Sequence, residues 1–353
     1  MNEITAKITG IKYAPLLCRG LHTFNFEGLD KALEKEATFI LKIDDKNRVA
    51  LSWWVSAKRT RSYPYARVYD SLSFLGKKVT IIPIVKDEGK DGDRDFLQWD
   101  TISLMSLLGI YVIIGYYDDA IRNPEYKNKI TEQRFDINYI RSQMNNLLSY
   151  QSDALHWNLL QVDKVAEIAK KALDSYDRIS KTIQIKMSDK KSAEKRINEL
   201  KKGKEIFMSL SRTLAEKAQK RESVTIQPKE KLDGTKATIT IRNYLGGNYY
   251  FTSDEILLEN NKLSLIDAKH TKGDKLPSLG DIKDGLLKMI LFTNLEEVKI
   301  NNKKVPHIPV LKLTTGDKFS IETASSSEKQ MLTILKTEAR ANNFKVMINK
   351  DFL

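Results

Sequence analysis

Two acidic positions and a lysine fall within a short segment that reads as a β-hairpin. Asp267 and Lys269 are two residues apart, and the side chains of a strand alternate, so both point to one face. The Asn-Asn pair at 260–261 is a tight-turn signal. The hairpin it predicts would bring the preceding acids, Asp254 and Glu255, to the level of that pair. Two carboxylates and an ammonium would then meet at one end of a sheet.

Such an arrangement suits a divalent cation. Carboxylates a few ångströms apart repel each other unless a cation lies between them, and Mg²⁺ takes one or two carboxylates, a carbonyl and several waters. We expect Asp267, one of the two acids Asp254 and Glu255, and the carbonyl of Ala268 to hold Mg²⁺, or Mn²⁺ in its place. The metal would polarise a phosphodiester oxygen and lower the pKa of a bound water, while Lys269 orients or deprotonates that water. These residues predict phosphodiester hydrolysis.

The order of elements around the hairpin resembles that of the PD-(D/E)XK nuclease superfamily: a helix, three strands carrying an acid and then acid-x-lysine, a helix and a strand. The matching residues are Asp254, in Ser253-Asp254, and Asp267-Ala268-Lys269. The run IDAKH is similar to the IEAKH type of signature found in type II restriction endonucleases. The resemblance covers roughly residues 194–315.

This resemblance implies a restriction-endonuclease-like core, a central mixed sheet flanked by helices, that cleaves double-stranded DNA with Mg²⁺. It implies Asp254 and Asp267 as metal ligands and Lys269 as the catalytic lysine. Ser253 stands where the motif has proline, and Glu255 follows Asp254 directly, so either acid could be the first; the position in the motif favours Asp254. Members of the superfamily also carry a glutamate in the preceding helix, where Glu205 or Glu216 could serve.

The motif alone does not identify a nuclease, because a sequence as short as acid-x-lysine also arises by chance and usually marks a surface ion pair. Its context favours a nuclease site: strand character, hairpin spacing and a helix on each side. The strands expected here are 237–243, 255–259, 263–270, 307–313 and 345–349, and the helices begin at Pro277 and span 327–342.

The 353 residues allow a mixed α/β (α+β) protein of several parts. We expect an N-terminal α/β region at 1–150 for DNA recognition, a helical hairpin at 151–222 and the nuclease core at 223–353. The N-terminal elements expected are strands 4–13, 38–43, 49–55, 78–85 and 111–116, and helices 29–36, 66–74 and 101–108. The hairpin would consist of helices at 152–187 and 188–221.

Charge points to a polyanionic partner. The 59 Lys and Arg residues exceed the 46 Asp and Glu residues by 13. Fifteen bases against eight acids lie between Lys186 and Lys236, which would suit a phosphate backbone. A generally lysine-rich proteome explains the same total, and a solvated helix face explains the local excess.

The segment 56–70 interleaves bases with tyrosines and is our expected recognition element, since arginine contacts guanine edges or phosphates and tyrosine stacks on bases. Packing of the tyrosines on their own domain is the structural alternative. The DNA contacts expected over the whole chain are Lys58, Arg59, Arg61, Tyr63, Tyr65, Arg67, Arg94, His270 and Lys272.

Three other patterns in the sequence resemble functional motifs only in part. GIYVIIGYY at 109–117 contains the letters of the GIY-YIG nucleases in one apolar run, which favours a single buried strand. The acidic segment 86–100 lacks EF-hand spacing and is expected to be an exposed functional loop. Ser56-Ala57-Lys58 after strand 49–55 echoes the later acid-x-lysine with serine in place of the acid.

A single cysteine, Cys18, excludes a disulfide framework, and four scattered histidines offer no zinc spacing. The longest apolar run is too short to span a bilayer, so we expect a cytoplasmic bacterial or archaeal protein without membrane contact. The leading hypothesis is a magnesium-dependent, sequence-specific endonuclease resembling type II restriction enzymes, working as a homodimer beside a DNA methyltransferase of the same specificity. The alternatives are a non-catalytic nucleic-acid-binding or defence-complex subunit, a structure-specific repair nuclease and an RNA-processing nuclease.

Overall fold

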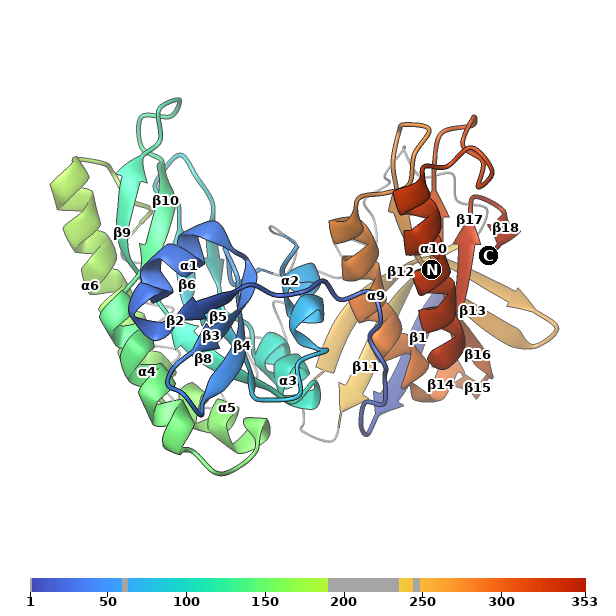
Figure 1. Cartoon of the computed structure of the whole chain (residues 1–353), viewed down its shortest axis with the longest axis horizontal. Helices are drawn as coiled ribbons and strands as arrows, with labels where there is room; N and C mark the ends of the chain where they lie inside the picture. Colours follow the sequence, from blue (N-terminus) through green and yellow to red (C-terminus); the bar gives the residue numbers. More distant parts are fainter. Residues whose placement is uncertain (1, 59–62, 190–234, 244–247) are drawn as a thin grey trace. The chain divides into compact units, whose positions relative to one another are not determined.

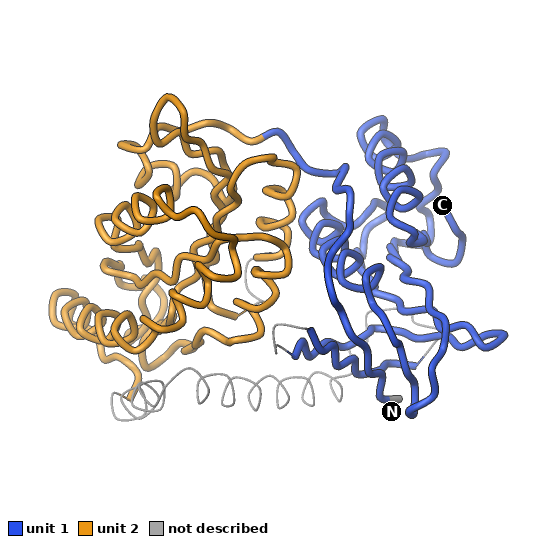
Figure 2. The backbone as a smooth tube through the Cα atoms, turned by 90° about the horizontal axis from the view of Figure 1, so that it is seen from below, with its two compact units in different colours: residues 1–20, 213–353 blue, residues 21–212 orange. Residues whose placement is uncertain are grey.

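Two sheets organise the computed structural model, which describes residues 2–58, 63–189, 235–243 and 248–353. The chain divides into two compact units (Figure 2): unit 1 is Met1–Gly20 with Thr213–Leu353, and unit 2 is Leu21–Arg212. The described residues are mixed α/β, with eight α-helices. The helix expected at 188–221, with Glu205 and Glu216, lies outside the described residues but for its first two positions. No described helix combines the length and the hydropathy that crossing a membrane requires.

Unit 1 is built on a nine-stranded mixed sheet with the order β15-β14-β1-β11-β12-β13-β16-β17-β18. These strands are β1 (Asn2–Ile8), β11 (Thr235–Asn243), β12 (Asn248–Glu259), β13 (Lys262–His270), β14 (Glu296–Ile300), β15 (Lys303–Lys304), β16 (His307–Thr314), β17 (Lys345–Ile348) and β18 (Asp351–Phe352).

The first strand joins the C-terminal sheet and not the N-terminal region with which the sequence grouped it. β1 pairs in parallel with β11, with Ile4 opposite Ile239. Ile4 and Ile8 are fully buried. The alternating apolar positions of β1 thus complete the core of unit 1, a long-range pairing that no local pattern announces.

The expected hairpin is present as β12 and β13. Asn260 and Asn261 both have positive φ, 48° and 61°, as a two-residue turn with the twist of the strands requires. The strands pair with Glu255 opposite Ile266. β12 begins seven residues earlier than expected, at Asn248, and its register against β11 shifts between Ser253 and Ile256, beside the acidic pair.

Two helices connect the parallel strands of unit 1. α9 (Leu279–Thr293) joins β13 towards β16, and α10 (Ser326–Ala341) joins β16 to β17. Ser278 caps α9 by accepting a hydrogen bond from the Asp281 N–H, as the sequence indicated. Consecutive right-handed crossovers place both helices over the same face of the sheet, as Figure 1 shows.

Gly285 sets how closely α9 approaches the sheet. A Cβ added at this position would lie 2.6 Å from Leu311 Cδ1 and 3.1 Å from Asp267 Oδ2. A larger residue would push the helix away, so glycine holds α9 directly against β13 and β16. Asp284 and Lys288, on this side of α9, are thereby brought close to the side chains of β13.

Unit 2 has a five-stranded sheet, β2-β3-β4-β5-β8, and two small hairpins. The segment 109–117 supplies the buried strand β8, as expected. The strands are β2 (Thr23–Asn25), β3 (Thr38–Lys42), β4 (Arg48–Trp53), β5 (Lys78–Pro83), β6 (Val85–Asp87), β7 (Arg94–Phe96), β8 (Ile110–Gly115), β9 (Tyr117–Arg122) and β10 (Ile130–Phe135), and the helices are α1 (Leu29–Lys35), α2 (Pro64–Ser71), α3 (Trp99–Leu107), α4 (Ile137–Ser149), α5 (Ala154–Asp163) and α6 (Val165–Ile183).

The single helix expected at 152–187 is two helices, α5 and α6. The break around Lys164 interrupts the helical hydrogen bonding, while the hydrophobic residues keep their helical spacing across it. Both belong to unit 2. The sequence analysis predicted neither the hairpin β9–β10 nor the helix α4. Asp136 caps α4 by accepting from the Tyr139 N–H, a local signal that could have found it.

Both units repeat one order of elements. In unit 1 an antiparallel hairpin (β12–β13) is followed by α9, the parallel strand β16, α10 and the parallel strand β17. In unit 2 the hairpin β3–β4 is followed by α2, parallel β5, α3 and parallel β8. Each unit inserts a small hairpin within this order, β14–β15 or β6–β7.

The Asn-Asn turns give the first prediction. Asn261→Val should destabilise the protein by about 1–2 kcal/mol in urea unfolding, because a β-branched residue resists left-handed backbone. Asn302→Val is the matched control, since Asn301 and Asn302 form a second turn with φ of 48° and 66° between β14 and β15. It should lower the stability by a similar amount, because its backbone is left-handed in the same way. Equal stability of Asn261→Val and the wild type would contradict the turn assignment.

Candidate active site

The acidic pair and the lysine of the hairpin come together on one face of the unit 1 sheet. Asp267 is fully buried, and its Oδ2 lies 3.1 Å from the Nζ of Lys269. Asp254, on the neighbouring strand, accepts a hydrogen bond at Oδ2 from the Ala268 N–H at 2.9 Å. The expected convergence of two carboxylates and an ammonium is therefore present, with the ligand role of the Ala268 carbonyl still a prediction.

Helix α9 adds two charged side chains that sequence reasoning missed. The Nζ of Lys269 lies 3.0 Å from Asp284 Oδ2, and the Nζ of Lys288 contacts Asp267 Oδ1. Asp284 and Lys288 are four residues apart and so share one side of the helix. A signal was present in the sequence: the two charges have helical spacing on the side of the helix that also carries Gly285.

Glu255 lies apart from this group. Its Oε2 accepts a hydrogen bond from the Lys312 Nζ at 2.9 Å, and both side chains are buried. Lys312 is the register partner of Ala268, whose side chain points away from that of Asp267. The choice between the two adjacent acids thus has a geometric answer: Asp254 accompanies Asp267, and Glu255 forms a buried ion pair on the other face.

Burial and neighbouring charges set the protonation of the two aspartates. Burial, aided by the charge of Asp267 and opposed by Lys288, raises the pKa of Asp254 from 3.8 to about 6. Burial also disfavours the charged form of Asp267, but the charges of Lys269 and Lys288 outweigh it and lower the pKa of Asp267. Asp267 therefore keeps its charge in the core, while Asp254 holds its proton more readily.

The residues present fit a magnesium ion. Asp254, Asp267 and Asp284 carry three negative charges against the two positive charges of Lys269 and Lys288. Asp267 Oδ2 is buried and accepts no hydrogen bond, although Lys269 lies beside it as an ion pair. No three potential ligands among Asp, Glu, His and Cys are grouped in the described residues. Two hard carboxylates with water as the remaining ligands still suit Mg²⁺, which seldom takes an all-protein cage.

Several expected DNA contacts are structural in unit 2. Tyr65 is 5% exposed and packs edge-on against Trp54. Arg67 donates a hydrogen bond to the Trp53 carbonyl at 2.8 Å and lies over the Trp53 ring. Arg94 donates to the Asp189 carbonyl at 3.0 Å. Tyr65 is buried and Arg67 is half-buried, and the contacts of both lie within their own unit, which favours the structural alternative for these two residues.

Other expected contacts keep an accessible surface. Tyr63 is 52% exposed, and the Lys58 side chain is 55% exposed. Lys272 is exposed, and His270 Nδ1 lies 2.9 Å from Thr314 Oγ1 at the end of β13. Arg59 and Arg61 lie outside the described residues.

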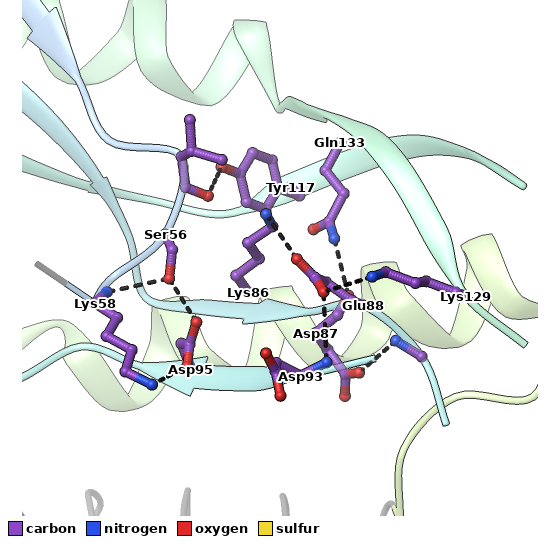
Figure 3. Close-up of polar contacts among 12 residues, drawn as sticks. Ser56, Lys58, Lys86, Asp87, Glu88, Asp93, Asp95, Tyr117, Lys129 and Gln133 are labelled. Atoms are coloured by element: carbon purple, nitrogen blue, oxygen red, sulfur yellow. Dashed lines mark hydrogen bonds and ion pairs between the residues drawn. The ribbon is translucent and has the colours of Figure 1, made fainter. Parts of the chain in front are cut away.

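The acidic segment 86–100 is only in part the exposed loop that was expected: Lys90, Asp91 and Asp93 are exposed between β6 and β7, while other acids of the segment make internal contacts (Figure 3). Asp87 and Glu88 are buried, and Glu88 lies 3.0 Å from Lys86 and 3.6 Å from Lys129. Opposite charges compensate these carboxylates, which lowers the free-energy cost of burying them. The segment Ser56-Ala57-Lys58 resembles the acid-x-lysine motif with serine in place of the acid. Ser56 donates a hydrogen bond to Asp95 at 2.8 Å, so a carboxylate from β7 lies beside this serine.

A cavity of about 700 Å³ lies in unit 2, and Trp53 and Phe135 are among its lining residues. Arg134 is the basic residue of its described lining. The acidic lining residues would repel a phosphate backbone, which argues against a DNA site here. They are Asp30, Glu34, Asp118, Asp119, Glu132 and Asp136.

No protein family model matches the chain, and no curated protein or solved structure matches it significantly. Function is therefore inferred from the residues of the site.

The raised pKa of Asp254 predicts a pH-dependent stability without divalent metal. A folded pKa near 6, above the ordinary 3.8, stabilises the fold at low pH, and this contribution is lost as the pH rises through about 6. Relative to Asp254→Asn, the wild type should lose up to about 3 kcal/mol between about pH 4 and pH 7 in urea unfolding with EDTA. Asp351→Asn, at an exposed carboxylate, should retain the wild-type dependence. Parallel curves for the wild type and Asp254→Asn would contradict the burial of this acid.

Proposed function

We propose that the protein is a magnesium-dependent endonuclease that hydrolyses phosphodiester bonds in double-stranded DNA, in the manner of type II restriction enzymes. The observation that carries the proposal is the meeting of Asp254, Asp267 and Lys269 on one face of the β12–β13 hairpin. Two carboxylates suit a hard divalent cation, and a neighbouring ammonium suits an attacking water and a charged phosphate.

The order of strands around the site supports this proposal. β11, β12 and β13 are antiparallel neighbours, α9 follows, and β16 pairs in parallel with β13. This is the order of three strands, helix and strand that the resemblance to PD-(D/E)XK nucleases implies. The helix that would precede β11 lies outside the described residues.

The two aspartates and Lys269 each have a role in the proposed reaction. Asp254 and Asp267 would hold Mg²⁺, which supplies Lewis-acid activation of the phosphodiester and of a water when bound. Lys269 is held by Asp267 and Asp284, 3.1 Å and 3.0 Å away, and this double contact fixes its ammonium beside the metal ligands. Burial of the site limits competing solvent and strengthens each electrostatic interaction.

The overall charge of +13 supports a polyanionic substrate. Lys58, Tyr63, His270 and Lys272 remain the proposed DNA contacts among the described residues. Cutting both strands of a duplex calls for two sites, so we propose a homodimer. A methyltransferase of the same specificity would protect the DNA of the cell.

Substitution of the site residues tests the activity. Asp267→Asn and Lys269→Met should each lower magnesium-dependent plasmid cleavage by about 10²- to 10⁴-fold, because each removes a metal ligand or a proton-handling group. DNA binding in a mobility-shift assay should change little. The readout is discrete fragments from DNA of known sequence.

Asp351→Asn and Lys350→Met are matched controls, since both residues are exposed and adjacent near the C-terminus of unit 1. They should cut at the wild-type rate. Wild-type cleavage by Asp267→Asn would defeat the assignment, and a smear or junction-specific nicks in place of fragments would favour a repair nuclease.

A second candidate is a non-catalytic nucleic-acid-binding subunit of a defence complex. It is favoured by the contacts of Lys288 and Lys269 with Asp267, which already compensate the buried carboxylate without a metal. Under this alternative the wild type binds DNA but gives no metal-dependent product.

A further inference from the structure

Lys288 is the site residue for which the proposed reaction gives no role. It projects from α9, its side chain is 16% exposed, and its Nζ contacts Asp267 Oδ1. The neighbouring Gly285 holds this part of the helix against β13. A lysine in such a position is costly to bury unless a carboxylate compensates its charge, so Lys288 acts as a counter-cation of the acidic pair.

A metal ion would compete with Lys288 for the same oxygens. Within the described residues, three of the four carboxylate oxygens of Asp254 and Asp267 already have contacts: with the Ala268 N–H, the Lys269 ammonium and the Lys288 ammonium. A divalent cation between two aspartates would lie within a few ångströms of both ammonium groups, where like charges repel strongly in a buried site. One ammonium has to move.

The contacts decide which lysine moves. Lys269 has a second carboxylate, Asp284, 3.0 Å from its Nζ, and keeps this partner when a metal takes Asp267. The described hydrogen bond and ion pair of the Lys288 ammonium are both to Asp267. Loss of the Asp267 contact therefore leaves Lys288 as the cation in need of a new anion.

We propose that Lys288 occupies the metal position in the metal-free protein, that a divalent cation displaces it, and that the displaced ammonium binds a phosphate of the DNA. This inference rests on the proposed function and adds a regulatory feature to it. DNA phosphate and metal favour the same displaced state, so each strengthens binding of the other, and the coupling is reciprocal. The site would load metal efficiently on DNA and poorly away from it.

Calcium binding measured by calorimetry, with Ca²⁺ as the probe, tests the displacement directly. Without DNA, Lys288→Met should bind Ca²⁺ about tenfold or more tightly than the wild type, because the competing cation is gone. Lys288→Arg keeps the charge and should bind Ca²⁺ as weakly as the wild type. Lys336→Met removes a lysine of α10 outside the site and serves as the control for net charge.

A second measurement adds a mixed-sequence DNA duplex. The duplex should strengthen Ca²⁺ binding to the wild type by about tenfold and should have a much smaller effect on Lys288→Met. Ca²⁺ should also raise the Tm of Lys288→Met more than that of the wild type. Lys288→Gln, which keeps a polar side chain, replaces Lys288→Met in both measurements if the methionine variant does not fold.

Equal Ca²⁺ affinities of the wild type and both neutral variants, including no binding by any of them, would overturn the displacement. If the wild type nevertheless cuts DNA with Mg²⁺, and Asp267→Asn does not, the proposed function stands and only the role of Lys288 fails. A duplex effect that is equal in the wild type and the neutral variants would overturn the phosphate contact.

Discussion

The buried carboxylate of Asp267 is the constraint on which the rest of unit 1 depends. A charge with no exposed surface has to be compensated, and Lys269 and Lys288 do so from the strand and from the helix. Asp254 adds a second acid beside it, and burial together with the charge of Asp267 raises the pKa of this acid. A site with an excess of negative charge suits a divalent cation.

Local features of the fold bring the charged side chains of the site together. The Asn-Asn turn fixes the register that places the two strands of the hairpin, and alternation separates Asp254 from Glu255. Gly285 lets α9 approach β13, so Lys288 reaches the carboxylate of Asp267 and Asp284 reaches the ammonium of Lys269.

Much of this was accessible from the sequence, because the hairpin follows from a turn signal and from alternation, both local rules. The helix α9 and the convergence of Asp254, Asp267 and Lys269 were predicted from such local patterns. Lys288 and Asp284 were not, since their contacts depend on how closely a helix packs on a sheet. The pairing of β1 with β11 and the burial of Asp87 and Tyr65 are likewise tertiary, and the charged or aromatic character of a segment says nothing of its depth.

The most direct measurement of the central claim is the anomalous X-ray scattering of crystals soaked in Mn²⁺. The account predicts a peak between the carboxylates of Asp254 and Asp267, with the Lys288 ammonium moved away from Asp267. Crystals that show no peak at this position, with Lys288 still on Asp267, or that show manganese only elsewhere, would contradict it.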